Sequence, residues 1–404
     1  MKRILSIVLV VIFVSAMIAG CGGTPAVAEE PAAGSEEAAE APAAASGEQA
    51  VVETDKPAFD EFPRPRIVTD RPLKVALITH PNEAESRERT RKQVIIEADH
   101  YGWQLTILEV ADASEYKDAF LSAINLNVDA IHVGNLNSMQ SIVDVIAQAR
   151  NAGIGVYNDD NEVVTGIIGN STMPNGVASM QLAYYIGEQR GWKGNVIYPS
   201  IPVMQVHMER LDPVLTLANN YVNWKNLEVI DVTSWPGGPG VAMSEIPNIW
   251  VDKYANEMTG VFCTADGICT AAAEVFKARG YDNPDLWMGG IDGGSDAFAY
   301  IRAGTPFMYD YSQPFEAYAH FTNQIIMDIQ VKGLNPGDPG CIISKLGEAI
   351  YTEGAIVTRE NVPDVGTVIH TLYDYYDPEE KDAWYTWETD KEKVYRISEG
   401  GVQE

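Results

Sequence analysis

Residues 73–79 read Leu-Lys-Val-Ala-Leu-Ile-Thr, a nearly continuous apolar run. Such a run is typical of a strand that is buried on both faces of a parallel sheet. A helical segment follows at residues 86–101, and a second strand pattern follows at residues 104–110. This order of strand, helix and strand predicts a parallel sheet with helices packed on its faces.

The same alternation continues along the chain and predicts the rest of the fold. Further strands are expected at residues 129–134, 154–157, 195–199, 227–232, 259–263, 286–291 and 306–311. Helical patterns separate them at residues 114–125, 138–151, 205–221, 244–258, 267–280 and 296–304. The alternation forms two runs, so the predicted fold class is α/β, with two doubly wound parallel-sheet domains.

The composition excludes one class of partner. The chain has 404 residues, 46% of them hydrophobic, which is enough to bury a sizeable core. Its formal net charge is -29. Binding to a phosphate backbone needs a basic surface, so we expect no nucleic-acid partner.

The N-terminus has the pattern of an export signal. Lys2 and Arg3 precede an apolar run at residues 4–19, which is somewhat short for a membrane-spanning helix. The following Ile-Ala-Gly-Cys, ending at Cys21, resembles the bacterial lipobox. That resemblance implies that residues 1–20 are a signal peptide and that Cys21 carries a lipid anchor to the membrane. The alternative is an uncleaved anchor helix, and both interpretations place the rest of the chain outside the cytoplasm.

A low-complexity stretch follows the lipobox. From residue 22 to about residue 62 the chain is rich in Ala, Glu, Pro, Gly and Ser and has no sustained apolar periodicity. Such a composition cannot bury enough surface to fold. We therefore expect residues 21–71 to form a lipidated, disordered acidic linker that holds the folded part away from the membrane.

The other cysteines are Cys263, Cys269 and Cys341. The chain has no C-x-x-C motif and no Cys/His cluster, so we expect no metal site. In an oxidising compartment Cys263 and Cys269 could form a local disulfide. Two small buried side chains are an equally good interpretation, and the sequence leaves both open.

Polar and aromatic residues follow one predicted strand after another. In open parallel sheets, ligands bind just outside the carboxyl ends of the strands, so these positions are candidates for a binding site. The candidates are His80, Asn82, Asn135, Asn137, Asn158, Asp159, Asp160, Asn161, Ser200, Trp235, Asp266, Asp292, Ser312 and Gln313. Their repetition at strand after strand predicts a polar ligand.

Five segments then point to a known family. They are residues 152–160 (Ala-Gly-Ile-Gly-Val-Tyr-Asn-Asp-Asp), 193–196 (Lys-Gly-Asn-Val), 261–266 (Val-Phe-Cys-Thr-Ala-Asp), 289–293 (Gly-Gly-Ile-Asp-Gly) and 312–316 (Ser-Gln-Pro-Phe-Glu). In this order and spacing, the chain from about residue 73 to 362 resembles the type I periplasmic sugar-binding proteins of the ribose- and galactose-binding kind. It equally resembles the effector domain of lac-repressor-type regulators.

The resemblance implies two doubly wound domains joined by three crossing strands, with the ligand in the cleft between them. Crossings are expected near residues 169–170, 312–313 and 341–342. The N-terminal α/β domain would then comprise residues 72–169 plus 313–340, and the C-terminal α/β domain residues 170–312 plus 341–362. Residues 363–404 form a C-terminal extension whose segment 373–387, dense in Tyr, Trp and acids, is expected to pack as a surface helix.

The resemblance also assigns roles to single residues. Asp160 would accept hydrogen bonds from ligand hydroxyls, with Asp159 as the alternative if the register shifts by one. Arg210 would donate to ligand oxygens from the second domain, and Trp235 would stack on a sugar face. Two further groups complete the predicted site: Asp292, Ser312 and Gln313 on the hinge side, and His80, Asn82 and Asn137 near the cleft mouth.

The match departs from the family in places, and several roles have structural alternatives. Asn161 stands where the family has an arginine, and Ala265 where it often has an asparagine. Arg210 could instead pair with a neighbouring acid, Trp235 could serve packing, and Asp292 could cap the following helix. For Asp266 the sequence favours helix capping over ligand binding.

The predicted function is an extracytoplasmic solute-binding lipoprotein of an ABC importer, binding a small polar ligand, expected to be a monosaccharide. Its expected partners are that ligand and ABC permease subunits in the membrane, and we expect a monomer without a cofactor. The chain lacks a G-x-S-x-G elbow, a Walker loop and an H-E-x-x-H motif, so we do not expect an enzyme. Alternatives are a ligand-sensing receptor for a membrane kinase or chemoreceptor, and a binder of nucleosides or signalling molecules.

Overall fold

The computed structural model describes residues 61–81, 84–111, 114–134, 136, 138–236, 239–254 and 257–364. Several sequence expectations lie outside these residues: the signal peptide, Cys21, most of the linker, Asn82, Asn137 and the C-terminal segment from residue 365. None of the helices in the described ranges combines the length and the apolar character that crossing a membrane requires.

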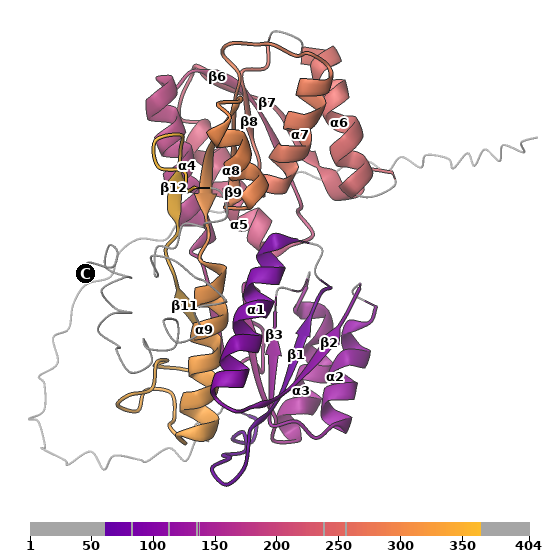
Figure 1. Ribbon diagram of the computed structural model, residues 1–404, viewed down its shortest axis with the longest axis vertical. Helices are drawn as coiled ribbons and strands as arrows, with labels where there is room; N and C mark the ends of the chain where they lie inside the picture. Colours follow the sequence, from indigo (N-terminus) through magenta and orange to yellow (C-terminus); the bar gives the residue numbers. More distant parts are fainter. Residues whose placement is uncertain are drawn as a thin grey trace, which may run out of the picture. The chain divides into compact units, whose positions relative to one another are not determined.

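The first domain contains a six-stranded parallel sheet in the order β11-β5-β4-β3-β1-β2 (Figure 1). Its strands are β1 (Lys74–Thr79), β2 (Gln104–Glu109), β3 (Ala130–Val133), β4 (Gly155–Asp159), β5 (Gly169–Thr172) and β11 (Glu348–Tyr351). Its helices are α1 (Glu85–His100), α2 (Tyr116–Asn125), α3 (Val143–Asn151) and α9 (Phe315–Ile326).

Strand β1 is almost entirely apolar because it is buried on both faces of the sheet. Ala76 and Ile78 pack against α2 and α3 on one face of the sheet. Val75 and Leu77 pack against α1 and α9 on the other face. Because successive side chains of a strand point to opposite faces, burial on both faces requires a continuous apolar run.

The second domain repeats this arrangement with a sheet in the order β12-β10-β9-β8-β6-β7. Only β12 runs antiparallel to its neighbour, β10. The strands are β6 (Gly194–Ser200), β7 (Trp224–Asp231), β8 (Gly260–Phe262), β9 (Trp287–Asp292), β10 (Phe307–Ser312) and β12 (Ala355–Val357). The helices are α4 (Asn175–Arg190), α5 (Gln205–Ala218), α6 (Pro239–Tyr254), α7 (Asp266–Ala278) and α8 (Ser295–Arg302).

Two hydrophobic clusters cover the faces of this second sheet. Helices α4 and α5 pack on one face, with Leu182 and Val214 among the buried residues. Helices α6, α7 and α8 pack on the other face, with Trp250 and Phe298 among the buried residues. The predicted fold class, two mainly parallel doubly wound sheets, is therefore confirmed.

The strands that connect the domains differ from the expectation in one respect. Residues 341–351 stay with the first domain, because Ile343 is fully buried in its core and β11 pairs with β5. The chain reaches the second sheet only at β12, so this crossing lies between Tyr351 and Ala355 rather than near Cys341. Apolar packing at Ile343 decides this position, and a local sequence pattern does not show which sheet a short strand joins.

The end of the expected linker also differs from the expectation. Residues 61–71 were expected to be disordered, but the structure packs them against the first domain. The Arg150 guanidinium lies over the ring of Phe62, 5.2 Å from the ring centroid. Arg71 donates two hydrogen bonds of 2.7 and 2.8 Å to the buried carboxylate of Asp129. The described residues 61–71 are thus bound to the first domain, because their arginines and Phe62 find partners on it. A composition rich in Pro and charge does not reveal such partners.

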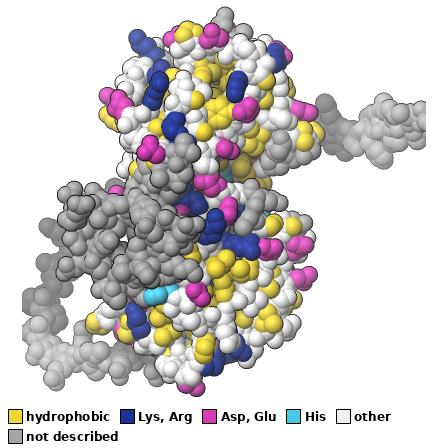
Figure 2. Space-filling view, in the orientation of Figure 1, with side chains coloured by type: hydrophobic (Ala, Val, Ile, Leu, Met, Phe, Trp, Pro, Cys, Tyr) yellow, Lys and Arg dark blue, Asp and Glu magenta, His cyan; other side chains and the backbone are white. Residues whose placement is uncertain are grey.

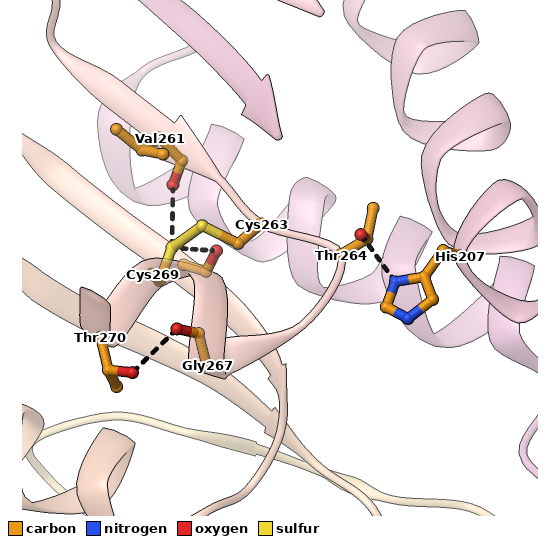
Figure 3. The surroundings of a disulfide bond; sticks show 8 residues. His207, Val261, Cys263, Thr264, Gly267, Cys269 and Thr270 are labelled. Atoms are coloured by element: carbon orange, nitrogen blue, oxygen red, sulfur yellow. Dashed lines mark hydrogen bonds between the residues drawn. A yellow bond between two sulfur atoms is a disulfide. The ribbon is translucent and has the colours of Figure 1, made fainter. Parts of the chain in front are cut away.

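A disulfide joins Cys263, just after β8, to Cys269 in α7, which resolves the two interpretations that the sequence left open (Figure 3). Both cysteines are fully buried. In the part of the chain that the structure describes, Cys341 is the unpaired cysteine. The bond closes a short loop that turns from the sheet into the helix.

Replacing both Cys263 and Cys269 by alanine should lower the free energy of unfolding by about 2 kcal/mol. A disulfide that closes a loop of about seven residues restricts the unfolded chain by an amount of this size. Urea unfolding under non-reducing conditions measures the effect. Cys341→Ala is the matched control and should change the midpoint little, and an equal midpoint for wild type and the double variant would contradict the expectation.

Candidate functional site

A cavity of about 630 Å³ is bordered by residues of both domains. Several of these residues stand at the carboxyl ends of β4, β6, β8 and β9, where a parallel sheet exposes a ligand site. The volume lies in the range of sites for small molecules. Its polar border consists of Glu85, Ser86, Arg87, Arg89, Asp160, His207, Arg210, Asp266, Thr270, Asp292 and Asp296. Its apolar border consists of Ala84, Ile201, Met204, Val206, Met243, Ala265, Ile268, Ala297 and Phe315.

Asp160 follows β4 and borders this cavity and two smaller hollows beside it. Its backbone has φ +45°, a left-handed conformation that is uncommon for a residue with a side chain. The N–H of Asp160 donates to Ser171 O at 2.8 Å, which fixes this turn at the sheet edge. Thr172 Oγ1 donates to the carboxylate at 3.3 Å. The turn therefore presents the Asp160 carboxylate to the cavity.

Asp159, the alternative in the register, points the other way. It is fully buried, and its Oδ2 lies 2.5 Å from His132 Nε2. The other ring nitrogen of His132 lies 3.0 Å from Asn323 Oδ1 on α9. Asp159 thus belongs to a polar network inside the first domain, while its neighbour Asp160 faces the cavity.

Arg210 enters the cavity from α5 and is almost fully buried. Its Nε donates to Asn175 Oδ1 at 2.8 Å, and its Nη1 donates to Thr264 O at 2.8 Å. Nη1 also donates to Asp292 Oδ1 at 3.0 Å. Its ion-pair partner is therefore Asp292 at the end of β9 and not one of the acids beside it on α5.

Gln313 lies directly behind this ion pair. Its Nε2 donates to Asp292 Oδ1 at 2.5 Å, while its Oε1 accepts from the hydroxyl of Tyr318 at 2.8 Å. Gln313 is fully buried and does not border the cavity. It orients the Asp292 carboxylate from behind, so three of the residues predicted from the sequence, Asp160, Arg210 and Asp292, share one cavity.

The other predicted residues in the described ranges are placed elsewhere. His80 is buried, with its Nε2 2.9 Å from the hydroxyl of Tyr116, and Ser312 is buried in β10. Trp235 packs on the core around α6 and donates from Nε1 to Glu245 at 3.0 Å. The structure does not bring any of these three to the cavity. The phenyl ring on its border belongs to Phe315 at the start of α9.

The sequence favours a helix-capping role for Asp266 over ligand binding. In the structure Asp266 lies both at the start of a helix and on the border of the cavity. It is the first residue of α7, it borders the cavity, and its Oδ2 accepts from the N–H of Gly294 at 2.7 Å. Gly290 lets α7 begin so close to β9, because a Cβ at this glycine would lie 2.8 Å from Cα of Asp266. The close approach buries the Asp266 carboxyl beside that of Asp292.

Burial raises the pKa of three carboxyls in this region. Burial and then the charge of Asp292 raise the pKa of Asp266 to about 8. Burial also raises the pKa of Asp292, although the Arg210 charge opposes this. Asp310 on β10 is fully buried, and both its oxygens lack a hydrogen-bond partner in the described part of the chain. Its pKa is raised well above the ordinary value by burial and by the charges of Asp266 and Asp292. Asp266 is therefore mainly uncharged at neutral pH.

His207 on α5 also borders the cavity and contributes no positive charge. Its Nδ1 lies 2.8 Å from Thr264 Oγ1, in the turn between β8 and the disulfide-linked start of α7 (Figure 3). Burial, followed by the charges of Arg210 and Arg87, holds the pKa of His207 well below its ordinary value. The neutral ring offers a hydrogen-bonding group without a charge.

Sequence reasoning missed the wall that α1 and α9 contribute. Glu85, Arg87 and Arg89 on α1 border the cavity with Phe315 on α9. Glu85 also connects the domains, since its Oε2 accepts from the N–H and hydroxyl of Ser295 at 2.8 and 2.6 Å. The sequence pointed to this wall only through the segment at residues 312–316, one of the five that carry the family resemblance. It contains Phe315 and Glu316, the ion-pair partner of Arg89.

Charged side chains of both signs occur on the surface and on the border of the cavity. On the face seen in Figure 2, acidic and basic side chains are interspersed and do not form one basic patch. Among the described residues, no group of three or more His, Cys, Asp or Glu side chains could hold a metal ion. The border of the cavity contains both acids and arginines, so it can offer hydrogen-bond donors and acceptors to a polar ligand.

A comparison with protein families matches residues 75–328 to the periplasmic binding protein domain. No curated protein sequence matches the chain significantly. Many solved structures share its fold, including a solute-binding protein from Burkholderia graminis C4D1M in complex with D-arabinose. That structure has a TM-score of 0.63 and 18% identity, covering 72% of this chain and 96% of its own.

Two further similar structures have related ligands. One is an ABC transporter solute-binding protein from Agrobacterium vitis with bound allitol, at TM-score 0.62 and 16% identity, covering 72% of this chain and 96% of its own. The other is the Caulobacter myo-inositol binding protein bound to myo-inositol, at TM-score 0.62 and 15% identity, covering 73% and 96%. At these identities the likeness shows the fold.

The buried carboxyls predict how stability depends on pH. A carboxyl whose pKa is higher in the folded than in the unfolded chain binds more protons when folded, so the free energy of unfolding falls as the pH rises between the two values. For Asp266 these values are 3.8 and about 8. Asp310 shifts in the same direction.

We expect Asp310→Asn to flatten this dependence. The amide has the shape of the carboxyl but does not titrate, so the slope above the ordinary carboxyl pKa of 3.8 should become shallower by up to about 1.4 kcal/mol per pH unit. Urea unfolding at several pH values measures the slopes. Asp282→Asn, at an exposed position, is the control. Identical slopes for wild type and Asp310→Asn would show that Asp310 is not held protonated by the fold.

Proposed function

The chain belongs to the periplasmic binding protein family, whose members are binding proteins and not enzymes, and on this premise we propose that it delivers a sugar or polyol to an ABC importer. The ligand would occupy the cavity bordered by both domains. We further propose the finer assignments made from the sequence: an extracytoplasmic lipoprotein anchored through Cys21, with ABC permease subunits as its membrane partner.

The observation that carries this proposal is the convergence of Asp160, Arg210 and Asp292 on one cavity. A polyhydroxy ligand presents hydroxyls that both donate and accept. Carboxylates and a guanidinium bind such groups by charge-assisted hydrogen bonds, roughly twice as strong as neutral ones. The ring of Phe315 offers a flat apolar surface for the C–H face of a sugar or polyol.

The ligands named for the structural relatives support the choice of ligand class. D-arabinose, allitol and myo-inositol are all uncharged and carry several hydroxyls. The cavity of this chain has the matching chemistry, because both acids and arginines border it and one of its buried carboxyls, Asp266, is mainly uncharged. An uncharged polyhydroxy ligand would meet donors and acceptors without an unpaired charge.

A thermal-shift screen of the purified full chain against monosaccharides, polyols and nucleosides tests the proposal. A ligand at 100 times its dissociation constant adds about 2.7 kcal/mol to the free energy of unfolding. We expect at least one sugar or polyol to raise the melting temperature and calorimetry to confirm one binding site. Stabilisation by nucleosides alone, or by no member of the panel, would refute this ligand class.

Arg210→Ala should weaken binding of the ligand found in the screen by about 2–5 kcal/mol, because the change removes a buried donor and leaves the partly buried Asp292 carboxylate without its partner. Isothermal calorimetry measures the loss. Arg279→Ala is the matched control, since Arg279 is exposed on the same domain and pairs with the surface residue Asp252. Unchanged affinity in Arg210→Ala would remove Arg210 from the site.

A further inference from the structure

We propose that Arg89 on α1 is a ligand-binding residue that donates through Nη1 and selects an uncharged hydroxyl oxygen over a carboxylate. This inference rests on the proposed function and assigns a specificity role to a residue that no sequence motif singled out. It follows from three features of Arg89: its hydrogen bonds, its packing and the charges around it.

The hydrogen bonds of Arg89 leave one nitrogen without a partner. Arg89 borders the cavity and is only 7% exposed. Its Nε and Nη2 donate to the two carboxylate oxygens of Glu316, each at 2.7 Å, and Nη2 also reaches Gln313 O at 3.3 Å. Nη1 is buried and has no hydrogen-bond partner in the described part of the chain. A buried donor of a charged group is costly to leave unpaired, so a ligand oxygen is its natural acceptor.

The packing holds this donor in one orientation. The Arg89 guanidinium lies over the Phe315 ring, 5.2 Å from its centroid, and Glu316 is 1% exposed. The carboxylate thus fixes one edge of the planar group and the aromatic ring supports its face. A donor that is already oriented loses little conformational freedom when the ligand binds. Phe315 borders the same cavity, so a ligand that accepts from Nη1 can also contact the ring.

The surrounding charges decide which oxygen this donor prefers. Glu316 neutralises Arg89 through a bidentate ion pair, so the pair has no net positive charge. Because Asp266 is mainly uncharged at neutral pH, the charged acids on the cavity border are Glu85, Asp160, Asp292 and Asp296. They outnumber the two border arginines that Glu316 does not neutralise, Arg87 and Arg210. A ligand carboxylate would meet this negative excess without a free cation to offset it. An uncharged oxygen has no such penalty.

A calorimetric titration of the full chain tests the inference with D-arabinose, allitol and myo-inositol, and with D-arabinonate as the charged counterpart of arabinose. We expect the wild type to bind the uncharged sugar at least 10-fold more tightly than the acid. Arg89→Lys keeps the positive charge but loses the fork geometry, and should weaken binding of the best uncharged ligand 10- to 100-fold. Arg91→Lys is the matched control on the same helix, paired with Glu109, and should bind as the wild type does.

Monodeoxy analogues of the best ligand separate a contact from a structural role. If Arg89 donates to one ligand oxygen, the analogue lacking that oxygen should bind wild type and Arg89→Lys equally, whereas the other analogues should keep the difference. Equal losses for every analogue would mean that Arg89 merely clamps α1 to α9, and would overturn the inference. Circular dichroism and melting curves establish that each variant folds.

Glu316→Gln provides a second test that does not alter Arg89. The amide keeps the shape of the side chain but leaves the guanidinium charge unbalanced, so affinity for D-arabinonate should rise at least 10-fold relative to arabinose. An unchanged ratio would overturn the assigned selectivity. If the wild type binds none of the uncharged ligands, the proposed function fails, and the inference fails with it. If the wild type binds but Arg89→Lys and Arg91→Lys behave alike, only the inference fails.

Discussion

The ion pair between Arg210 and Asp292 is the interaction on which the cavity depends. Arg210 also binds Asn175 at the start of α4 and the carbonyl of Thr264 after β8, while Asp292 also accepts from Gln313 after β10. One nearly buried pair therefore ties together two helices and three strand ends. Because a buried charge that loses its partner is strongly destabilising, these elements hold one another in place and shape one wall of the site.

This constraint also sets the charge state of the wall. Packing α7 against β9 brings Asp266 beside the Asp292 charge, and Asp310 lies on the neighbouring strand β10. The pKa values of both Asp266 and Asp310 rise. The disulfide encloses residues 264–268, most of which border the cavity, and so holds this short turn beside the carboxyls. A wall of this kind offers both hydrogen-bond donors and hydrogen-bond acceptors, as a polyhydroxy ligand requires.

Much of the site could be predicted because the residues that follow parallel strands meet at one edge of a sheet. That rule led to Asp160 and Asp292, and the resemblance added Arg210. The rule does not tell which strand-end residue turns inward: Asp159 and His80 follow it equally well and are buried in the first domain. It also could not find Arg89, because its partner Glu316 lies 227 residues away and its own helix has few apolar residues to mark a face.

The sequence by itself determined the alternation of strands and helices, and with it the two parallel sheets, because burial on one or both faces leaves a periodic trace in the order of apolar residues. Only the tertiary structure decided that residues 341–351 stay with the first domain, that Cys263 and Cys269 are bonded, and that Phe315 borders the cavity while Trp235 does not. These outcomes depend on contacts between residues far apart in the chain or on the direction of a single side chain. Neither long-range contacts nor the direction of one side chain can be predicted from a local pattern of apolar residues.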